Sequence, residues 1–500
     1  MPGLGLKIAS GARQCLELKI EPAMIAEIQP NPWMVSPFVA LLAMIALAPL
    51  FFADWWGKHY TKVAFGLAAV TLVYYFVGLH AGERVAHTAE EYISFIALIG
   101  SLYVVSGGIH INVQGEATPM ANVVFLLVGA LAANLLGTTG ASMLLIRPWI
   151  RMNKYRVTGH HVCFFIFIVS NVGGCLTPIG DPPLFLGYLK GVPFWWVAEH
   201  CLPMWATGVG ILLAMFYFVD VRNFRRTPKP VREKETAHET WRFDGLGNIF
   251  FLAVILGAVF INKPMFLREA LMLATAAGSY YTTKKSVHES NHFNFHPVKE
   301  VAILFVGIFA TMMPALDWLS LNAGHLTGGE PPAQFFYWGS GILSSVLDNA
   351  PTYLAFLSSI FGSFIDQDII AQVQHLIASG GADIATFVHG PHAEQVRQTF
   401  AALQHYHGDH VLSKCVIQDE IEVCFLLGNV KFNAYILAIS IGAVFFGANT
   451  YVGNGPNFMV KAIADQQKVH TPTFVDYIWK FTLPFMLPMI LIVWLVFFCG

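Results

Sequence analysis

Residues 174–185 read GCLTPIGDPPLF, and residues 447–458 read GANTYVGNGPNF. The two stretches align without a gap, with glycine at the first and seventh positions, threonine at the fourth and proline at the tenth. Each interrupts an apolar run with residues that break helices. A Gly/Pro-interrupted hydrophobic segment in corresponding places of two halves is the best sequence pointer to a transporter's binding site.

The composition indicates a membrane protein. The chain has 500 residues, of which 55% are hydrophobic and 12% charged, and its mean hydropathy is +0.57. Soluble domains carry about 25% charged residues, whereas repeated apolar runs of about 20 residues are typical of membrane-spanning helices. We expect an all-α polytopic protein in a lipid bilayer, of the bacterial inner membrane type. No basic stripe suggests a nucleic-acid partner, and we expect neither a cofactor nor enzymatic activity.

Twelve apolar segments can be drawn. Two of them are about 31 residues long and have polar or helix-breaking centres, so we predict re-entrant hairpins at 120–150 and 332–362. The remaining ten are predicted spans, at 34–53, 61–80, 91–112, 161–187, 195–220, 247–263, 265–281, 298–317, 432–458 and 474–497.

The hairpins also align with each other, at an offset of 210 residues that places Thr138-Thr139 on Asp348-Asn349. Both halves then run in one order: three spans, a hairpin, a broken span and a final span. Five crossings in each half is an odd number, so the second half is predicted to be inverted. The expected regions are an extramembrane segment (1–33), a first repeat (34–220), a basic cytoplasmic linker (221–246) and a second repeat (247–500) with an extramembrane insert (363–430).

The distribution of basic residues favours this topology. With 221–246 in the cytoplasm and hairpins that do not cross, 18 Lys and Arg lie inside and 10 outside. The same count places residues 1–33 and the insert outside. The insert holds six histidines, and we interpret it as a solvated domain with incidental histidines rather than a metal site.

Two aspartates lie at predicted membrane depth. Asp348 is at the centre of the second hairpin, where a charge costs roughly 2.5–3.5 kcal/mol on insertion scales and is a functional candidate by default. Asp181 in the first broken span has a simpler alternative role, because Asp before Pro is a common helix cap. We therefore expect Asp348 to be the principal ion-binding residue.

Other polar side chains surround the glycines and the hairpin tips. Unwound backbone and the oxygens of Thr and Asn suit a dehydrated hard cation, although they can equally satisfy the broken backbone. In an inverted repeat the two tips meet the two broken helices near the midplane. The complete predicted ion- or substrate-binding set is Asp348, Asn349, Thr352, Asn171, Thr177, Asp181, Asn449, Thr450, Asn454, Thr138, Thr139 and Ser142.

The motifs at Ser170–Pro183, Leu347–Pro351 (LDNAP) and Gly447–Asn457 resemble the ion transporter superfamily, in particular NhaD-type sodium/proton antiporters, arsenite permeases and a group of citrate transporters. The resemblance covers roughly residues 34–500, with the insert outside it. It implies scaffold and transport regions, a homodimer and elevator-type alternating access. The first hairpin departs from the pattern, because it has GTTG at 137–140 where dicarboxylate relatives show Ser-Asn-Thr.

Secondary active transport is the predicted function, and Na+/H+ antiport is the first interpretation. An acidic buried site without Lys or Arg attracts a monovalent cation, and a proton competes for the same carboxylate. The alternative is cation-coupled uptake of citrate, another carboxylate or an oxyanion, held by half-helix N-termini. A membrane metalloenzyme using the insert and a passive channel fit the pattern less well.

Overall fold

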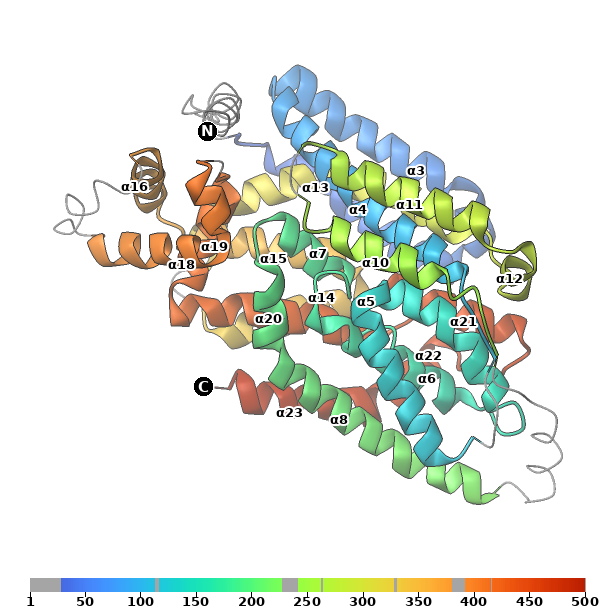
Figure 1. Cartoon of the computed structure of the whole chain (residues 1–500). Helices are drawn as coiled ribbons and strands as arrows, with labels where there is room; N and C mark the ends of the chain where they lie inside the picture. The colour runs from blue at the N-terminus through green and yellow to red at the C-terminus, as the bar shows by residue number, and fades with distance from the viewer. Residues whose placement is uncertain are drawn as a thin grey trace, which may run out of the picture.

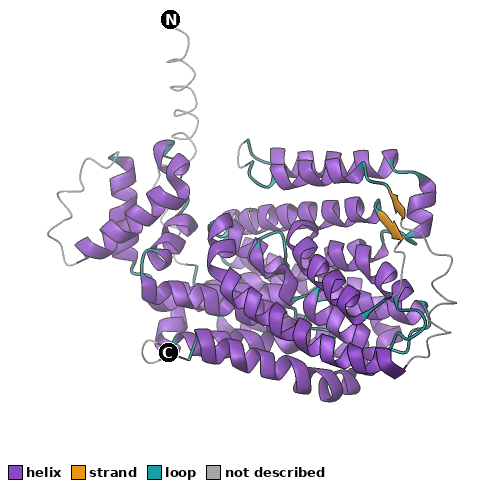
Figure 2. Ribbon diagram, turned by 60° about the horizontal axis from the view of Figure 1, so that its bottom comes forward, coloured by secondary structure: helices purple, strands orange, loops and turns teal. Residues whose placement is uncertain are grey.

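The computed structural model describes residues 28–112, 117–226, 242–261, 264–327, 331–379, 392–414 and 416–499 (Figure 1). Three predicted regions therefore fall partly outside the described residues: the N-terminal segment, the basic linker and the insert. Almost all of the described chain is helical, and a single pair of short antiparallel strands joins His110–Asn112 (β1) to Arg242–Asp244 (β2) (Figure 2).

The first half contains these helical elements: η1 (Pro32–Val35), α2 (Ser36–Phe51), α3 (Ala53–Val73), η2 (Tyr74–Gly78), α4 (Gly82–Gly107), α5 (Pro119–Met152), α6 (Gly159–Ile168), η3 (Val172–Leu176), α7 (Pro182–Leu189) and α8 (Phe194–Arg226). The second half contains α10 (Asn248–Ala258), α11 (Leu267–Thr282), α12 (Lys285–Ser290), α13 (His296–Thr327), α14 (Ala333–Val346), α15 (Asn349–Phe364), α16 (Gln367–Ala378), α18 (Ala393–Leu412), α19 (Gln418–Leu427), α20 (Val430–Phe446), η4 (Gly447–Asn449), α21 (Gly455–Gln466), α22 (Phe474–Tyr477), η5 (Ile478–Met486) and α23 (Leu487–Phe497).

Within the described residues, nine helices are long and apolar enough to cross a membrane, or ten if the bent pair α15–α16 is counted. The prediction of an all-α polytopic membrane protein is confirmed. The predicted spans at 247–263 and 265–281 are shorter than expected, because α10 has 11 residues and α11 has 16. Crossing the hydrocarbon takes about 20 residues. Pro264 and Phe266, which has a φ of 60°, interrupt the chain between the two helices.

Both predicted hairpins fold back on themselves in the structure. In α5 the backbone is non-helical at Gly137 (φ 71°), which glycine adopts readily. The arms on either side touch: the side chain of Asn122 bonds to that of Asn153 at 2.9 Å, and Phe125 stacks on Trp149 with ring centroids 5.4 Å apart. In the second hairpin, α14 and α15 separate at Leu347–Asp348, and a Cβ at Gly339 would lie 2.9 Å from the ring of Phe356.

The broken helices form the core, and the hairpins have exposed apolar faces. Every residue of α6 from Val162 to Ile168 is fully buried, as is most of α20. One arm of α5 instead presents a stripe of exposed apolar side chains at helical spacing: Met120, Val124, Val128, Leu131 and Leu135. Such a stripe suits contact with lipid acyl chains.

Polar contacts tie the early helices of the two halves together. Asp317 of α13 accepts hydrogen bonds from Tyr75 at 2.7 Å and from Arg84 at 2.9 Å. Glu269 of α11 accepts one from Ser94 of α4 at 2.6 Å. In Figure 1 these helices (α3, α4, α11 and α13) lie side by side in the upper part of the molecule, and α4 also packs against α5.

The predicted insert forms a small helical unit of α16, α18 and α19, which Figure 1 places at one end of the molecule. Its own core includes Val373, Val396 and Leu403. Lys190, just after α7, forms an ion pair with Asp419 of this unit at 3.1 Å. Burial alone would raise the pKa of the Asp419 carboxyl, but Lys190 holds it below its usual range.

Candidate functional site

Asp181 lies at the point where both hairpins and both broken helices meet. Its backbone is extended, and α7 starts at the following Pro182, so it occupies the N-cap position predicted from the sequence. Its side chain makes no capping hydrogen bond, however. The carboxylate, which is 1% exposed, instead accepts from Thr138 at 2.8 Å, from Asn349 at 2.6 Å and from Asn454 at 3.0 Å. Capping alone therefore does not explain this residue.

The three donors to Asp181 come from three different elements. Thr138 begins the second arm of α5, Asn349 begins α15, and Asn454 immediately precedes α21. With α7 these elements bring together all four of the segments that the sequence predicted to converge. Among the described residues, no lysine or arginine hydrogen-bonds to the carboxylate, so amides and a hydroxyl alone stabilise it.

Asp181 and Asn454 occupy equivalent positions in the two halves, and they bond directly to each other. The alignment of the two Gly/Pro motifs places one on the other at an offset of 273. Asp181 precedes α7 as Asn454 precedes α21, and both have extended backbones. Corresponding residues therefore face each other across the centre of the site, one with a carboxylate and one with an amide.

The tips of the hairpins correspond with an offset of 211, one residue more than the sequence alignment predicted. Thr138 and Asn349 each follow the helix break of their hairpin, and each donates to Asp181. Thr138 is therefore equivalent to Asn349 rather than to Asp348. At the tips the predicted offset is therefore one residue too small.

Equivalent hydrogen bonds hold the hairpins to the broken helices in both halves. Asn134 donates to the carbonyl oxygen of Gly173 at 2.7 Å, and Ser345, 211 residues later, donates to that of Phe446 at 3.4 Å. The hydroxyl of Thr177 donates to the carbonyl of Asn134 at 2.6 Å, as that of Thr450 does to the carbonyl of Ser345 at 2.7 Å. Thr177 and Thr450 thus satisfy hairpin backbone beside the site rather than face Asp181.

A second group of predicted residues extends the network on one side of Asp181. The amide of Asn454 also donates to the side-chain oxygen of Asn171 at 3.2 Å, and Asn171 donates to Asn457 at 2.6 Å. Ser142 shares a hydrogen bond of 2.7 Å with Ser170. All of these side chains are buried. Asn171 and Ser142 therefore belong to the buried polar centre, although neither hydrogen-bonds directly to the Asp181 carboxylate.

Asp348 and Thr352 lie at the start of α15, beside Asn349. The carboxylate of Asp348 accepts the backbone N–H of Ala350 at 3.0 Å and so caps α15, while the hydroxyl of Thr352 bonds to the carbonyl of Asp348 at 2.9 Å. Asp348 thus caps α15, whereas the carboxylate of Asp181 accepts the three converging hydrogen bonds. At the helix break, Asn349 rather than Asp348 bonds to Asp181. That Asp348 binds the ion stays a prediction.

A small cavity of about 20 Å³ lies beside Asp181, lined by the turn 137–140 of the first hairpin and by residues 178–182. Thr139 lines it without a hydrogen bond to Asp181. A cavity of this size has room for one water or a bare ion. Asn449 lies farther away, where it donates to Ser345 at 2.9 Å.

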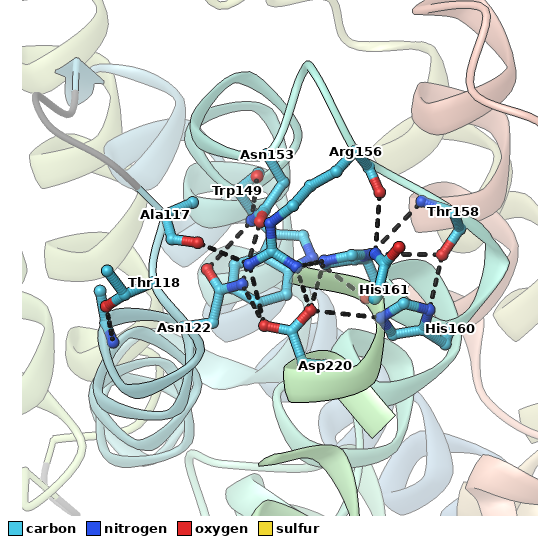
Figure 3. A network of polar contacts seen from close by, with 12 residues as sticks. Ala117, Thr118, Asn122, Trp149, Asn153, Arg156, Thr158, His160, His161 and Asp220 are labelled. Atoms are coloured by element: carbon cyan, nitrogen blue, oxygen red, sulfur yellow. Dashed lines mark hydrogen bonds and ion pairs between the residues drawn. The ribbon is translucent and has the colours of Figure 1, made fainter. Parts of the chain in front are cut away.

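The base of the first hairpin is fixed by a separate buried network (Figure 3). Arg156 pairs with Asp220 of α8 through both terminal nitrogens and donates to the carbonyl of Ala117 at 2.5 Å. Asn122 and Asn153, from the two ends of α5, bond to each other, and Asn122 also donates to Asp220 at 2.9 Å. We interpret this network as structural, because the Arg156 guanidinium already neutralises the Asp220 carboxylate.

Sequence reasoning missed Asn134, Ser345 and Ser170 as parts of the site. The first two correspond to each other once the hairpins are aligned at the helix break, because Asn134 then falls on Ser345. Ser170 opens the motif Ser170–Pro183, so its place beside Asn171 was a signal that could have included it.

Comparison with known proteins supports a transport role. A family model described as "Putative citrate transport" matches residues 27–498, nearly the whole chain. No curated protein sequence matches the chain.

Proposed function

The chain belongs to this citrate transport family, and from that premise we propose that it carries citrate or a related carboxylate across the membrane together with a cation. The family membership and the apolar helices support a secondary transporter in a multi-pass membrane protein. They favour the carboxylate alternative over Na+/H+ antiport, the first interpretation of the sequence.

The observation that carries this proposal is the convergence of helix starts on Asp181. Helices α7, α15 and α21 begin at Pro182, Asn349 and Gly455, next to the network around the carboxylate. Helix N-termini carry a partial positive charge and favour anions. A carboxylate substrate can therefore be held without lysine or arginine, while the buried Asp181 supplies a negative charge for the coupling cation.

Coupling follows from the balance of charge at this centre. A carboxylate buried among neutral groups is costly unless it is paired. A bound Na+ or proton would neutralise Asp181, after which the same helix starts can accept an anion without repulsion from the carboxylate. The cation would then strengthen the binding of the substrate, and by linkage the substrate would strengthen the binding of the cation.

The cavity of about 20 Å³ beside Asp181 is too small for a molecule of the size of citrate. Loading such a substrate would require the hairpin tips and the broken helices to separate. We propose that the hairpins re-enter the membrane from opposite faces in an inverted repeat, and that the polar contacts between α3, α4, α11 and α13 mark the fixed scaffold. By the family resemblance, the motion would be of the elevator type within a homodimer.

The test is transport by the purified chain in proteoliposomes. Uptake of radiolabelled citrate would be measured with an inward Na+ gradient, with an inward proton gradient and with neither, beside empty liposomes. Na+-driven proton movement without citrate would be followed in the same vesicles. We expect gradient-driven citrate uptake that unlabelled tricarboxylates and dicarboxylates inhibit. Exchange of Na+ for H+ without any citrate uptake would refute the proposal and would favour the Na+/H+ antiport interpretation instead.

A further inference from the structure

We infer that His407, His410 and Glu420 form a binding site for a divalent transition metal ion of the Zn²⁺ type, at the junction between the insert and the end of α7. His407 and His410 lie near the end of α18, and Glu420 lies in the first turn of α19. One ligand atom from each residue lies within 4.8 Å of the other two. Around a tetrahedral Zn²⁺ with bonds of ~2.0–2.1 Å, ligand atoms are separated by about 3.3 Å.

The distances to the Glu420 carboxylate bracket that value. Its Oε1 is 2.7 Å from Nδ1 of His410 and 3.7 Å from Nδ1 of His407. The helix is broken at His407, whose backbone dihedrals are φ −130° and ψ 34°. His407 and His410 are three residues apart, a spacing that places side chains on one face of a helix.

The surroundings orient two of the ligands. Nε2 of His407 lies 3.0 Å from the carbonyl oxygen of Gly191. A carbonyl only accepts, so Nε2 carries the hydrogen and the lone pair of a neutral ring is on Nδ1, which faces Glu420. The other oxygen of Glu420 accepts the backbone N–H of Ile417 at 3.2 Å. A histidine that donates its second ring nitrogen to a carbonyl, and a carboxylate held by a backbone N–H, are the outer contacts usual around protein-bound metals.

Two other clusters of similar composition show why this one stands apart. The cluster of His160, His161 and Asp220 has the Arg156 guanidinium on its carboxylate. In the cluster of His87, Glu91 and Asp419, Lys190 lies 2.8 Å from Glu91 and 3.1 Å from Asp419. A permanent cation in each occupies the position that a metal would need.

Glu420 has no such partner. Among the described residues its ion pairs are with His407 and His410 alone. Its side chain is 7% exposed, and the two histidines are 14% and 25% exposed. The cluster thus holds a largely buried carboxylate that, among the described residues, has imidazoles rather than a lysine or arginine beside it.

An ion has a path to the cluster. All three residues line a cavity of about 750 Å³ between α18, the turn after α7 and the α10–α11 connection. Two imidazoles and one carboxylate leave a coordination position open toward this space, for water or another ligand. Nitrogen ligands select Zn²⁺ and its neighbours over Mg²⁺ and Ca²⁺, which prefer oxygen.

The consequence concerns the attachment of the insert to the transporter. The metal would join α18 to α19 and, through His407, to the carbonyl of Gly191, two residues after α7. The contact is close, because a Cβ at Gly191 would lie 3.0 Å from the Cα of Glu420. A bound ion would therefore stabilise the junction between the insert and the broken helix that begins beside Asp181.

The test measures metal binding by the full-length chain, purified in detergent through a tag without histidines and stripped with EDTA. Equilibrium dialysis against Zn²⁺ should give one tight site per chain. The double variant His407→Ala/His410→Ala should bind at least about 100-fold more weakly, since losing even an outer contact costs 10–100-fold. His405→Ala is the matched control, because this exposed histidine lines the same cavity outside the cluster.

Glu420→Gln provides a second variant that keeps an acceptor for Ile417 and should also lose the site. Co²⁺ bound to the wild type should give the visible absorption bands of a tetrahedral centre, absent from this variant. Equal Zn²⁺ binding by wild type and by either cluster variant, or an equal loss in His405→Ala, would overturn the assignment. Competition by Mg²⁺ at similar concentration would overturn the choice of metal.

Discussion

The sharpest prediction concerns Asp181→Asn. This substitution keeps the size and shape of the side chain but removes its charge. The three hydrogen bonds from Thr138, Asn349 and Asn454, at 2.6–3.0 Å, become neutral contacts that an amide can partly retain by reorienting its neighbours. We expect the variant to fold with close to wild-type stability, because a weaker set of hydrogen bonds is offset by no longer burying a charge.

The loss of cation binding should be much larger. A unit charge about 4 Å from a cation contributes about 4 kcal/mol at an effective dielectric constant of about 20. Since about 1.4 kcal/mol is a factor of ten in an equilibrium constant, Asp181→Asn should weaken the binding of the coupling cation by about 10³-fold. Citrate uptake should then no longer respond to the Na+ or proton gradient at any concentration that supports the wild type.

Asp348→Asn is the matched control. Asn caps a helix as well as Asp does, so the contact with the N–H of Ala350 survives and stability should change by less than about 0.5 kcal/mol. Initial uptake rates of radiolabelled citrate in proteoliposomes, measured against Na+ concentration and pH, would compare both variants with the wild type. The reasoning fails if citrate uptake by Asp181→Asn keeps the wild-type dependence on Na+ and pH. It also fails if Asp348→Asn loses as much of that dependence as Asp181→Asn does.

Three further predictions test the fold around this centre. Gly180→Ala should reduce the yield of folded protein in size-exclusion profiles, because its Cβ would lie 2.0 Å from a backbone carbonyl oxygen; Gly210→Ala, with nothing within 4 Å, should not. Arg156→Met should lower the free energy of unfolding by about 3–5 kcal/mol, since it removes the guanidinium from the buried Asp220 carboxylate and leaves only Asn122 and two imidazoles beside it; unaltered thermal unfolding would contradict this. A cysteine at the exposed Leu412 should react with a membrane-impermeant thiol reagent from outside the cell; labelling only after permeabilisation would exclude the inverted topology.

The fold was largely predictable because its main signals are local. Apolar length identifies most spans, and the two over-long segments with polar centres indicated the hairpins. The Gly/Pro motifs located both helix breaks, and Pro182 correctly marked the start of α7. The helices predicted at 247–263 and 265–281 were too long, because hydropathy measures the apolar character of a stretch and not where the backbone stops being helical.

The site was predicted as a set of residues but not in its arrangement. Thr138, Asn349, Asp181 and Asn454 were all expected at one centre, and hydrogen bonds join them there. Which aspartate faces the others depends on the rotation of α15 about its own axis. A one-residue change at a helix start rotates a side chain by about 100°, and sequence patterns rarely fix a boundary to one residue.

The contact between Asp181 and Asn454 bears on how such a protein can arise. In an assembly of two identical half-length chains, the residues at these two positions would have to be the same. Two aspartates about 3 Å apart would repel and share a proton, and two asparagines would leave the centre without a charge. A single negative charge at this contact is possible only when the two halves differ in sequence. Joining both halves in one chain lets them diverge at this position, so covalent fusion is one route to a centre with one carboxylate.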